Sequence, residues 1–453
     1  MAHPGQHGLK RALGLSLGLA IAFGGTLGVG ILRLPGVVAG AVGSPGLALL
    51  FWLLGAGYAF LSALALAELA TLRPESGGFR VYVRAAFGDG AAFATGWVDV
   101  LVVMSSTAYA AVSAGDFIGA LVPSLAGHST AVGLALVALL VCAQWVGVRT
   151  GGGVTLAVSL GISLLVLLVV IACFIHGPAG EAAGLPVVAV APIPAFGWAA
   201  LLALVPAVRS IITAYDGWYS PMYLAGEHHD PGRTLPRALL GGVAVVAAVY
   251  LLINIALLRV LSVPQLAASS MPVAAAAQIV LPRAGALLVT LFSLLVMVNL
   301  VNTNLLLTPR VLYSMSTEGW LPAVLQRCGP GGTPRAALAT CAGIVAALVL
   351  SGSFDQLVAL FAVVVTLYYC AAFLAVLVLR LRQPQLPRPF RMPLFPLPAL
   401  LPLAVTLAFL VASAVQEPRS AIAAGVYLLL AVPFYHAARR LNPAQRQAAS
   451  LKG

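Results

Sequence analysis

Charged side chains are scarce in this chain. Of its 453 residues only 8% are Asp, Glu, Lys or Arg, whereas 61% are hydrophobic. A water-soluble globule of this size would lack the polar side chains needed to cover its surface. The composition therefore excludes a soluble protein and indicates that lipid is the main solvent.

Cysteine pairs and catalytic motifs are missing as well. The five cysteines lie within or beside apolar segments and include no CxxC pair, so we expect small buried side chains rather than disulfides. The sequence contains no HExxH, GxSxG, P-loop or pair of intramembrane aspartates at helical spacing. These absences argue against an enzyme and against a bound metal or organic cofactor.

Apolar runs long enough to cross a bilayer recur along the whole chain. A helix needs about 20 apolar residues to cross the hydrocarbon core. Short polar or proline-rich breaks separate these runs. They predict an all-α polytopic membrane protein with twelve transmembrane helices, at about residues 12–41, 45–71, 91–121, 129–148, 153–176, 197–224, 237–262, 284–313, 335–351, 354–380, 395–415 and 419–438.

The excess of basic residues indicates the topology. The formal net charge is +12, which alone could suggest nucleic acid. With the N-terminus placed in the cytoplasm, however, 19 of the 24 Lys and Arg residues fall on the cytoplasmic side. We therefore expect a multi-pass protein of the cytoplasmic (inner) membrane, with both termini in the cytoplasm and no nucleic-acid partner.

Two predicted helices are interrupted near their middle. In the first, four glycines fall within residues 24–30, and each destabilises a helix by about 1 kcal/mol relative to alanine. In the sixth, residues 210–221 include an aspartate, a glycine and a proline. We predict breaks near Thr26 to Ile31 and near Tyr215 to Tyr219. Simple kinks or close-packing glycines are the alternative interpretation.

The spacing of the two breaks predicts the architecture. Unpaired backbone within a membrane must be buried in protein or line a cavity, so the two breaks predict one cavity. They lie five spans apart, and five is odd, so the second five helices should be inverted relative to the first. We predict one transporter domain over 1–453, with repeats at 12–176 and 197–380 and two extra helices at 395–438. A channel would instead need a continuous polar lining.

Five motifs follow one another along the chain. They are Gly28-Val29-Gly30-Ile31-Leu32 with Pro35-Gly36; Ala67-Glu68-Leu69-Ala70 with Pro74 to Phe79, Phe87-Gly88 and Gly96-Trp97; Ala214-Tyr215-Asp216-Gly217-Trp218 with Glu227, Pro231 and Leu235-Pro236-Arg237; Arg310 to Met315 with Glu318-Gly319 and Leu321-Pro322; and Arg388-Pro389-Phe390-Arg391.

These motifs resemble the amino acid, polyamine and organocation (APC) transporter superfamily, close to its LAT-like branch. The resemblance runs nearly end to end. It implies a LeuT-type fold, with a 5+5 inverted repeat and broken helices 1 and 6, and a secondary transporter working by alternating access. Neutral L-amino acids are the expected cargo. A polyamine or amine transporter and an amino acid antiporter of the same fold are the alternatives.

The resemblance also implies a substrate site at the two breaks. N–H groups of the broken first helix would bind the substrate carboxylate, because a helix end and its dipole favour an anion. Carbonyls of the sixth helix would accept from the ammonium group, and further side chains would select the substrate, with simple packing as their alternative role. The expected residues are Thr26, Gly28, Val29, Gly30 and Ile31; Ser105 or Ser106 and Tyr109; Ala214, Tyr215, Asp216, Gly217 and Trp218; and Asn299, Asn302 or Asn304.

Ionisable residues inside the spans suggest function, since a charge is costly in lipid. Three roles are open to Asp216: binding the substrate amine, carrying a coupling proton, or capping the helix that restarts. Asp99 and Glu68 are expected to pair with cytoplasmic arginines. Three residues near the external mouth are expected either to form a gate or to snorkel to the interface. They are Arg33, Asp116 and Arg209.

The coupling mode stays open. Many family members without sodium dependence carry a lysine in the fifth helix, yet residues 154–175 contain neither lysine nor arginine. All seven histidines lie in tails or near helix ends, which argues against a histidine relay. Sodium coupling, proton coupling and exchange are therefore all considered. Animal LAT-like carriers bind an ancillary glycoprotein through an external cysteine, which residues 122–130 lack, so we expect no ancillary subunit and a carrier acting alone or as a homodimer.

Overall fold

The computed structural model is built from helices. It describes residues 9, 11–28, 30–177, 187–188, 198–269, 271–351, 354–416 and 418–441. Within these ranges there is no β-strand, only two isolated bridges, Leu13 with His228 and Cys328 with Pro334. The helices are α1 (Leu15–Thr26), α2 (Gly30–Val42), α3 (Pro45–Leu72), α4 (Phe79–Phe87), α5 (Asp89–Leu121), η1 (Pro123–Leu125), α6 (Ser129–Val146), α7 (Val148–His176), α8 (Trp198–Ala214), η3 (Ser220–Glu227), α9 (Pro231–Val260), α10 (Val263–Ala268), α11 (Pro272–Val280), α12 (Gly285–Thr317), η4 (Ala323–Gln326), α13 (Arg335–Ser351), α14 (Phe354–Arg382), α15 (Leu397–Gln416) and α16 (Pro418–Leu441).

Each of the twelve predicted apolar segments contains a helix or an interrupted pair of helices. Within the described residues, seven helices are by themselves long and apolar enough to cross a membrane, and α1 with α2 forms an eighth, bent candidate. The chain is therefore a multi-pass helical membrane protein. Sequence analysis missed the short helices α4, α10 and α11, because segments of six to nine residues give little hydrophobic periodicity.

The first break lies where it was predicted. Helix α1 ends at Thr26 and α2 begins at Gly30, and the two axes are bent by 52°. Gly28 lies in the short connection, where an added Cβ would meet no atom closer than 3.8 Å. The glycines thus open the helix because they lose more backbone entropy in a helix than any other residue, while buried apolar residues such as Phe23 and Leu32 continue on either side.

The second break also lies where it was predicted. Helix α8 ends at Ala214, residues 215–219 form a turn, and the chain restarts as the 3-10 helix η3. Gly217 has φ +103°, a conformation that side-chain-bearing residues rarely adopt. Pro221 follows at the start of η3, where its missing N–H is not needed.

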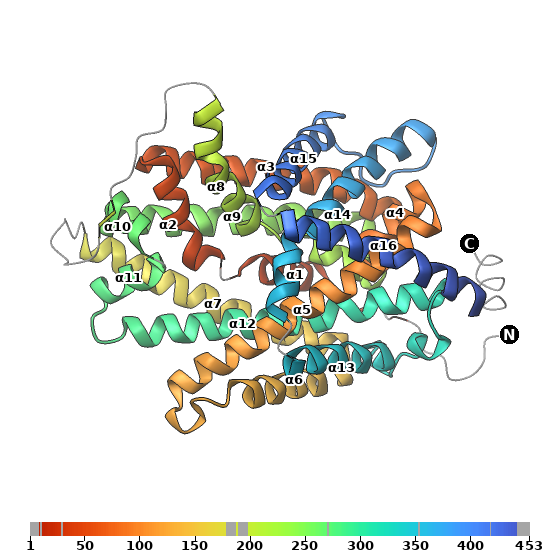
Figure 1. The fold of residues 1–453 in the computed structure, drawn as a ribbon, viewed down its shortest axis with the longest axis horizontal. Coiled ribbons are helices and arrows are strands. Elements are labelled where there is room, and N and C mark those ends of the chain that lie inside the picture. Colours follow the sequence, from red (N-terminus) through yellow and green to blue (C-terminus); the bar gives the residue numbers. More distant parts are fainter. Residues whose placement is uncertain are drawn as a thin grey trace.

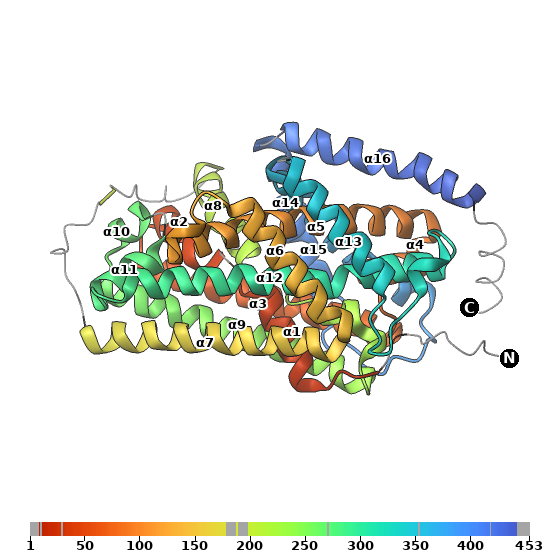
Figure 2. The ribbon, with the colours of Figure 1, turned by 90° about the horizontal axis from the view of Figure 1, so that it is seen from below.

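Packing between distant helices brings the two breaks together. The long helices α7, α9 and α12 run side by side along the long axis, with α2, α8, α10 and α11 at one end and α4 at the other (Figures 1 and 2). Helix α5 packs on α12, α3 on α9, and α2 on α8. At their closest approach, a Cβ on Gly217 would lie 2.1 Å from the carbonyl oxygen of Gly25. Only glycine at position 217 allows this contact.

Candidate functional site

A pocket lies between the two breaks and is closed laterally by α5 and α12. Its empty volume is about 490 Å³. Hydroxyl, amide and carboxyl groups face it, together with backbone of both breaks and some apolar side chains. The lining residues are Gly25, Val103, Ser106, Asp216, Gly217, Tyr219, Ser220, Tyr223, Leu300, Thr303, Asn304, Leu307 and Thr308.

Side chains from other helices cap the carbonyls at the end of α1. A helix end leaves its last carbonyls without intrahelical partners. The Leu27 N–H donates to Phe23 O at 2.8 Å, Asn299 Nδ2 donates to Gly24 O at 3.1 Å, and the Tyr250 hydroxyl lies 3.1 Å from Thr26 O. The carbonyl of Gly25, which lies between these capped groups, receives no side-chain hydrogen bond from the described residues, and Gly25 lines the pocket.

Tyr250 joins the two breaks. Its hydroxyl is 3.1 Å from Thr26 O in the first break and 2.9 Å from Ala214 O at the end of α8. The ring is fully buried and packs against Trp52 and Tyr215, with ring centroids 5.4 and 5.1 Å away. Because a hydroxyl has one proton, it can donate fully to only one of the two carbonyls at a time. Tyr250 therefore fixes the distance between the broken ends.

Asp216 lies at the wall between two cavities. One is the central pocket, and the other is a smaller one formed with Tyr58, Thr366 and Thr406. The Tyr369 hydroxyl donates to Asp216 Oδ1 at 2.6 Å. Among the described residues no Lys or Arg forms an ion pair with it. A carboxyl group without a cation at this depth is a candidate for binding a cationic group or a proton.

The buried acids nearer the α4 end of the bundle differ from one another. Glu68 accepts from Arg380 at 2.6 Å and from Arg388 at 3.0 Å, as predicted. The prediction for Asp99 is wrong: its Oδ1 accepts from the Tyr223 hydroxyl at 3.1 Å, and no arginine in the described ranges pairs with it. Tyr223, on η3, occupies the place next to Asp99 at which an arginine was expected.

The residues predicted to bind the substrate through their backbone do not all line the same cavity. Asp216 and Gly217 line the pocket, whereas Ile31 lines a different, apolar cavity. A Cβ on Gly30 would lie 3.4 Å from Ala214 Cα, so these two residues hold the breaks side by side. Thr26 turns its hydroxyl to Ala22 O, and Val29 lies outside the described residues.

The predicted aromatic residues mostly support the site from behind. Tyr215 donates to Trp52 O at 3.1 Å, and Trp218 stacks on Tyr369 at 6.3 Å. Tyr109 is 37% exposed and is not among the pocket-lining residues. The aromatic rings that line the pocket belong instead to Tyr219 and Tyr223, which sequence analysis did not select.

Sequence analysis left open which serine of α5 and which asparagine of α12 lines the pocket, and in each group one residue does. Ser106 does, while Ser105 is buried and donates to Leu101 O at 2.7 Å. Among the asparagines Asn304 lines it, whereas Asn302 donates to Gly151 O and Thr155 Oγ1, both at 2.9 Å, and ties α12 to α7. The missed hydroxyls at 303 and 308 share one face of α12 with Asn304, so polar residues at helical spacing were the available signal.

The proposed gate residues are not assembled in this structure. Arg33 and Asp116 are both exposed, and no ion pair joins them. Arg209 is half-buried. A gate formed by these residues therefore remains a prediction for another conformation.

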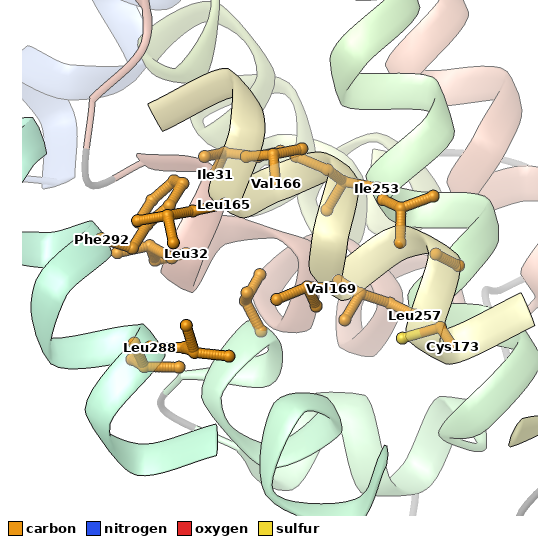
Figure 3. A pocket seen from close by; sticks show the side chains of 14 residues that line it. Ile31, Leu32, Leu165, Val166, Val169, Cys173, Ile253, Leu257, Leu288 and Phe292 are labelled. Atoms are coloured by element: carbon orange, nitrogen blue, oxygen red, sulfur yellow. The ribbon is translucent and has the colours of Figure 1, made fainter. Parts of the chain in front are cut away.

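A further cavity, formed by α2, α7, α9, α11 and α12, is lined entirely by apolar side chains and Cys173 (Figure 3). Ile31, Val166, Leu257 and Phe292 point into it from four of these helices. It offers no acceptor for an ammonium group and no donor for a carboxylate. It cannot recognise a zwitterion, so we assign the functional site to the central pocket.

Two interrupted helices that meet at a polar pocket define a membrane protein with a binding site between its helices. The chain belongs to the amino acid permease family, which matches residues 13–434. This confirms the APC superfamily that the motifs resembled, and relatives of the Asc and LAT types confirm the LAT-like branch.

The curated relatives are similar along nearly the whole chain. The serine/threonine exchanger SteT of Bacillus subtilis is 27% identical, with 97% of this chain and 99% of the relative covered. The human Asc-type amino acid transporter 1 is 31% identical, with 94% of this chain and 82% of the relative covered. The human cystine/glutamate transporter is 27% identical, covering 96% and 86%. All three names are those of transporters or exchangers, not of enzymes.

Proposed function

We propose that this protein carries small neutral L-amino acids across the cytoplasmic membrane by alternating access, with the central pocket as its substrate site. The single observation that carries this is the pocket itself: two helix breaks, Asp216 and a row of hydroxyl and amide groups meet in one cavity. The names of the relatives, a serine/threonine exchanger among them, support an amino acid as cargo.

The substrate's two charged groups have separate partners in this proposal. Its carboxylate is bound by the backbone N–H groups of Gly28 and Gly30, at the start of α2, where the helix dipole favours an anion. Its ammonium group is bound by the Gly25 carbonyl and by Asp216, both of which line the pocket. Ser106, Thr303 and Asn304 then contact the side chain, and their small polar groups favour small polar or neutral substrates.

The architecture proposed for alternating access is twelve spans in two inverted repeats, 12–176 and 197–380, followed by two helices at 395–438. Corresponding helices of the two halves pack on each other, α3 on α9 and α5 on α12. The short helix α4 follows the second span of one half, and α10 and α11 follow the second span of the other. This correspondence supports a 5+5 repeat of the LeuT type.

The distribution of basic residues supports cytoplasmic termini. We propose a carrier without an ancillary subunit, acting alone or as a homodimer, although one human relative is named as a small subunit.

A second candidate function is transport of a cationic amine. The observation that favours it is Asp216, a carboxyl group at the pocket with no paired cation in the described chain. An amine without a carboxylate would leave the N–H groups at the start of α2 unused, which is why we rank it second.

The test is uptake of a mixture of radiolabelled neutral L-amino acids into proteoliposomes. Ser106→Leu fills the pocket and is expected to abolish saturable uptake, whereas Thr340→Leu places the same side chain on an exposed site of α13 and should leave uptake unchanged. If folded wild-type protein carries no amino acid but carries putrescine, the second function replaces the first.

A further inference from the structure

Asp99 is a buried acid that the transport cycle proposed above does not use. It lies on α5, one helical turn before Val103, which lines the pocket. Asp99 is only 3% exposed, and its carboxyl group accepts a hydrogen bond from the Tyr223 hydroxyl at 3.1 Å. A buried ionised carboxylate without a counter-charge is strongly unfavourable, and such groups in membrane proteins are functional by default.

The guanidinium of Arg80 is bound by residues other than Asp99. Arg80 on α4 is near enough to Asp99 to interact with it electrostatically, but its guanidinium donates to Ser314 Oγ at 2.6 Å and forms an ion pair with Glu318. Both of these partners lie on or at the end of α12. An ionised Asp99 would compete for Arg80, so the observed arrangement fits a protonated, neutral carboxyl group.

Tyrosines surround Asp99 on its remaining sides. Tyr223 donates a hydrogen bond to it from η3, and Tyr219 of the second break and Tyr368 of α14 are near enough to interact with it electrostatically. The Tyr368 hydroxyl is buried and has no hydrogen-bond partner in the described chain. This unused donor is available to an ionised Asp99 after a rotamer change, so the surroundings can accept either charge state.

Two of these tyrosines connect Asp99 with the substrate pocket. Tyr223 donates to Asp99 and also lines the pocket, and Tyr219 faces both Asp99 and Asp216. On the other side, Arg80 and Glu318 lead to Arg84, whose side chain is 42% exposed. Asp99 thus lies between the substrate site and an ionic cluster that reaches the surface.

We propose that Asp99 is a proton-binding site and that its protonation couples amino acid transport to the proton gradient. The inference rests on the proposed transport function. A proton from water converts the Asp99 carboxylate to a neutral carboxyl group, which leaves Arg80 with Glu318 and keeps α4 joined to α12. When Asp99 releases the proton to the opposite side of the membrane, Arg80 moves towards the carboxylate and its contacts with Glu318 and Ser314 weaken. The hydrogen bond between Tyr223 and Asp99 then transmits the change to the pocket.

The test uses the full-length protein in proteoliposomes with radiolabelled L-serine and entrapped pyranine, a pH-reporting dye. With one-to-one coupling, an inward gradient of one pH unit should raise serine accumulation about tenfold in empty vesicles, because one pH unit is a tenfold concentration ratio. Added serine should acidify the wild-type lumen. Asp99→Asn should lose both effects while serine exchange in serine-loaded vesicles persists at least in part.

Two further variants separate coupling from folding. Asp99→Glu keeps a titratable group and should restore gradient stimulation. Asp230→Asn makes the same chemical change at an exposed site before α9 and should behave like the wild type. Serine exchange without any effect of the proton gradient, or full stimulation in Asp99→Asn, would overturn the inference but leave the transport function standing. Absence of both uptake and exchange for every amino acid would instead overturn the proposed function.

Discussion

The two helix breaks differ in what they present to the pocket. The first, between α1 and α2, offers backbone: its carbonyls are capped by Leu27, Asn299 and Tyr250, and the carbonyl of Gly25 lies between capped groups. The second, after α8, offers side chains: a carboxyl group from Asp216 and aromatic rings from residues 219 and 223.

The restart after each break differs too. The first resumes as an ordinary α-helix at Gly30, whereas the second resumes as the 3-10 helix η3. Helix η3 is anchored by Glu227, which forms a fully buried ion pair with Arg310 at 2.8 Å. In the proposed function the first break binds the substrate through its backbone, while the second contributes the carboxyl group of Asp216 to the ammonium group and places Tyr223 next to Asp99.

Glycine substitutions sharpen this comparison most strongly. A methyl group on Gly217 would lie 2.1 Å from Gly25 O, and its φ of +103° is costly for alanine, by about 1–3 kcal/mol from backbone strain alone. Gly217→Ala should therefore abolish uptake and lower the unfolding temperature. Gly28→Ala meets no atom within 3.8 Å and should reduce uptake much less. If both variants lost the same fraction of uptake and had the same unfolding temperature, the two breaks would not play different roles.

Tyr250→Phe tests whether the breaks act together. Removing the hydroxyl leaves Thr26 O and Ala214 O without this donor, and an unsatisfied buried group costs roughly 1–3 kcal/mol. We expect uptake to fall about tenfold, since 1.4 kcal/mol is a factor of ten. Tyr215→Phe removes a hydroxyl that serves only Trp52 O and should cause a smaller loss. Similar losses in both variants would remove Tyr250 from its bridging role.

Two asparagines on α12 should separate recognition from stability. Asn304→Ala changes the pocket wall and should alter KM and the order of preferred amino acids. Asn302→Ala breaks contacts with Gly151 and Thr155 and should lower the unfolding temperature, by roughly 1–3 kcal/mol of stability, with preference unchanged. Competition assays and thermal unfolding distinguish the two, and a change of preference in Asn302→Ala would place it in the site after all.

The smallest predicted effect concerns His228, which lies where the segment before α1 contacts the end of η3. Residues 12 and 13, before α1, donate to Glu227 O at 2.9 and 3.0 Å, beside the buried His228. Burial, and secondarily the neighbouring His229, lowers the pKa of His228 from 6.5 to about 4. The unfolded chain therefore takes up a proton at higher pH than the folded one, so stability is full above pH 6.5 and falls as the pH is lowered towards 4.

At pH 5.5 this corresponds to about 1 kcal/mol, since one pKa unit is worth about 1.4 kcal/mol. His228→Gln should unfold with a weaker dependence on pH between 6.5 and 4 than the wild type, as measured by thermal unfolding in detergent. An unchanged dependence of the unfolding temperature on pH would show that protonation of His228 does not lower the stability of the folded protein.

The sequence alone determined the multi-pass helical class, the positions of both breaks and the family. These properties are local, since twenty apolar residues must be helical in lipid and clustered glycines open a helix wherever they occur. The sequence also singled out the acid at position 216, which lines the pocket, because a charge at bilayer depth is rare enough to stand out.

Only the tertiary structure decided which side chains face the pocket. Successive residues on a helix are rotated by about 100°, so Ser105 and Ser106, or Asn302 and Asn304, point in different directions that depend on how the helices pack. The caps from Asn299 and Tyr250 and the pairing of Asp99 with Tyr223 join residues 124 to 275 positions apart. Such contacts depend on helix rotation and packing between distant segments, which no local pattern in a single sequence specifies.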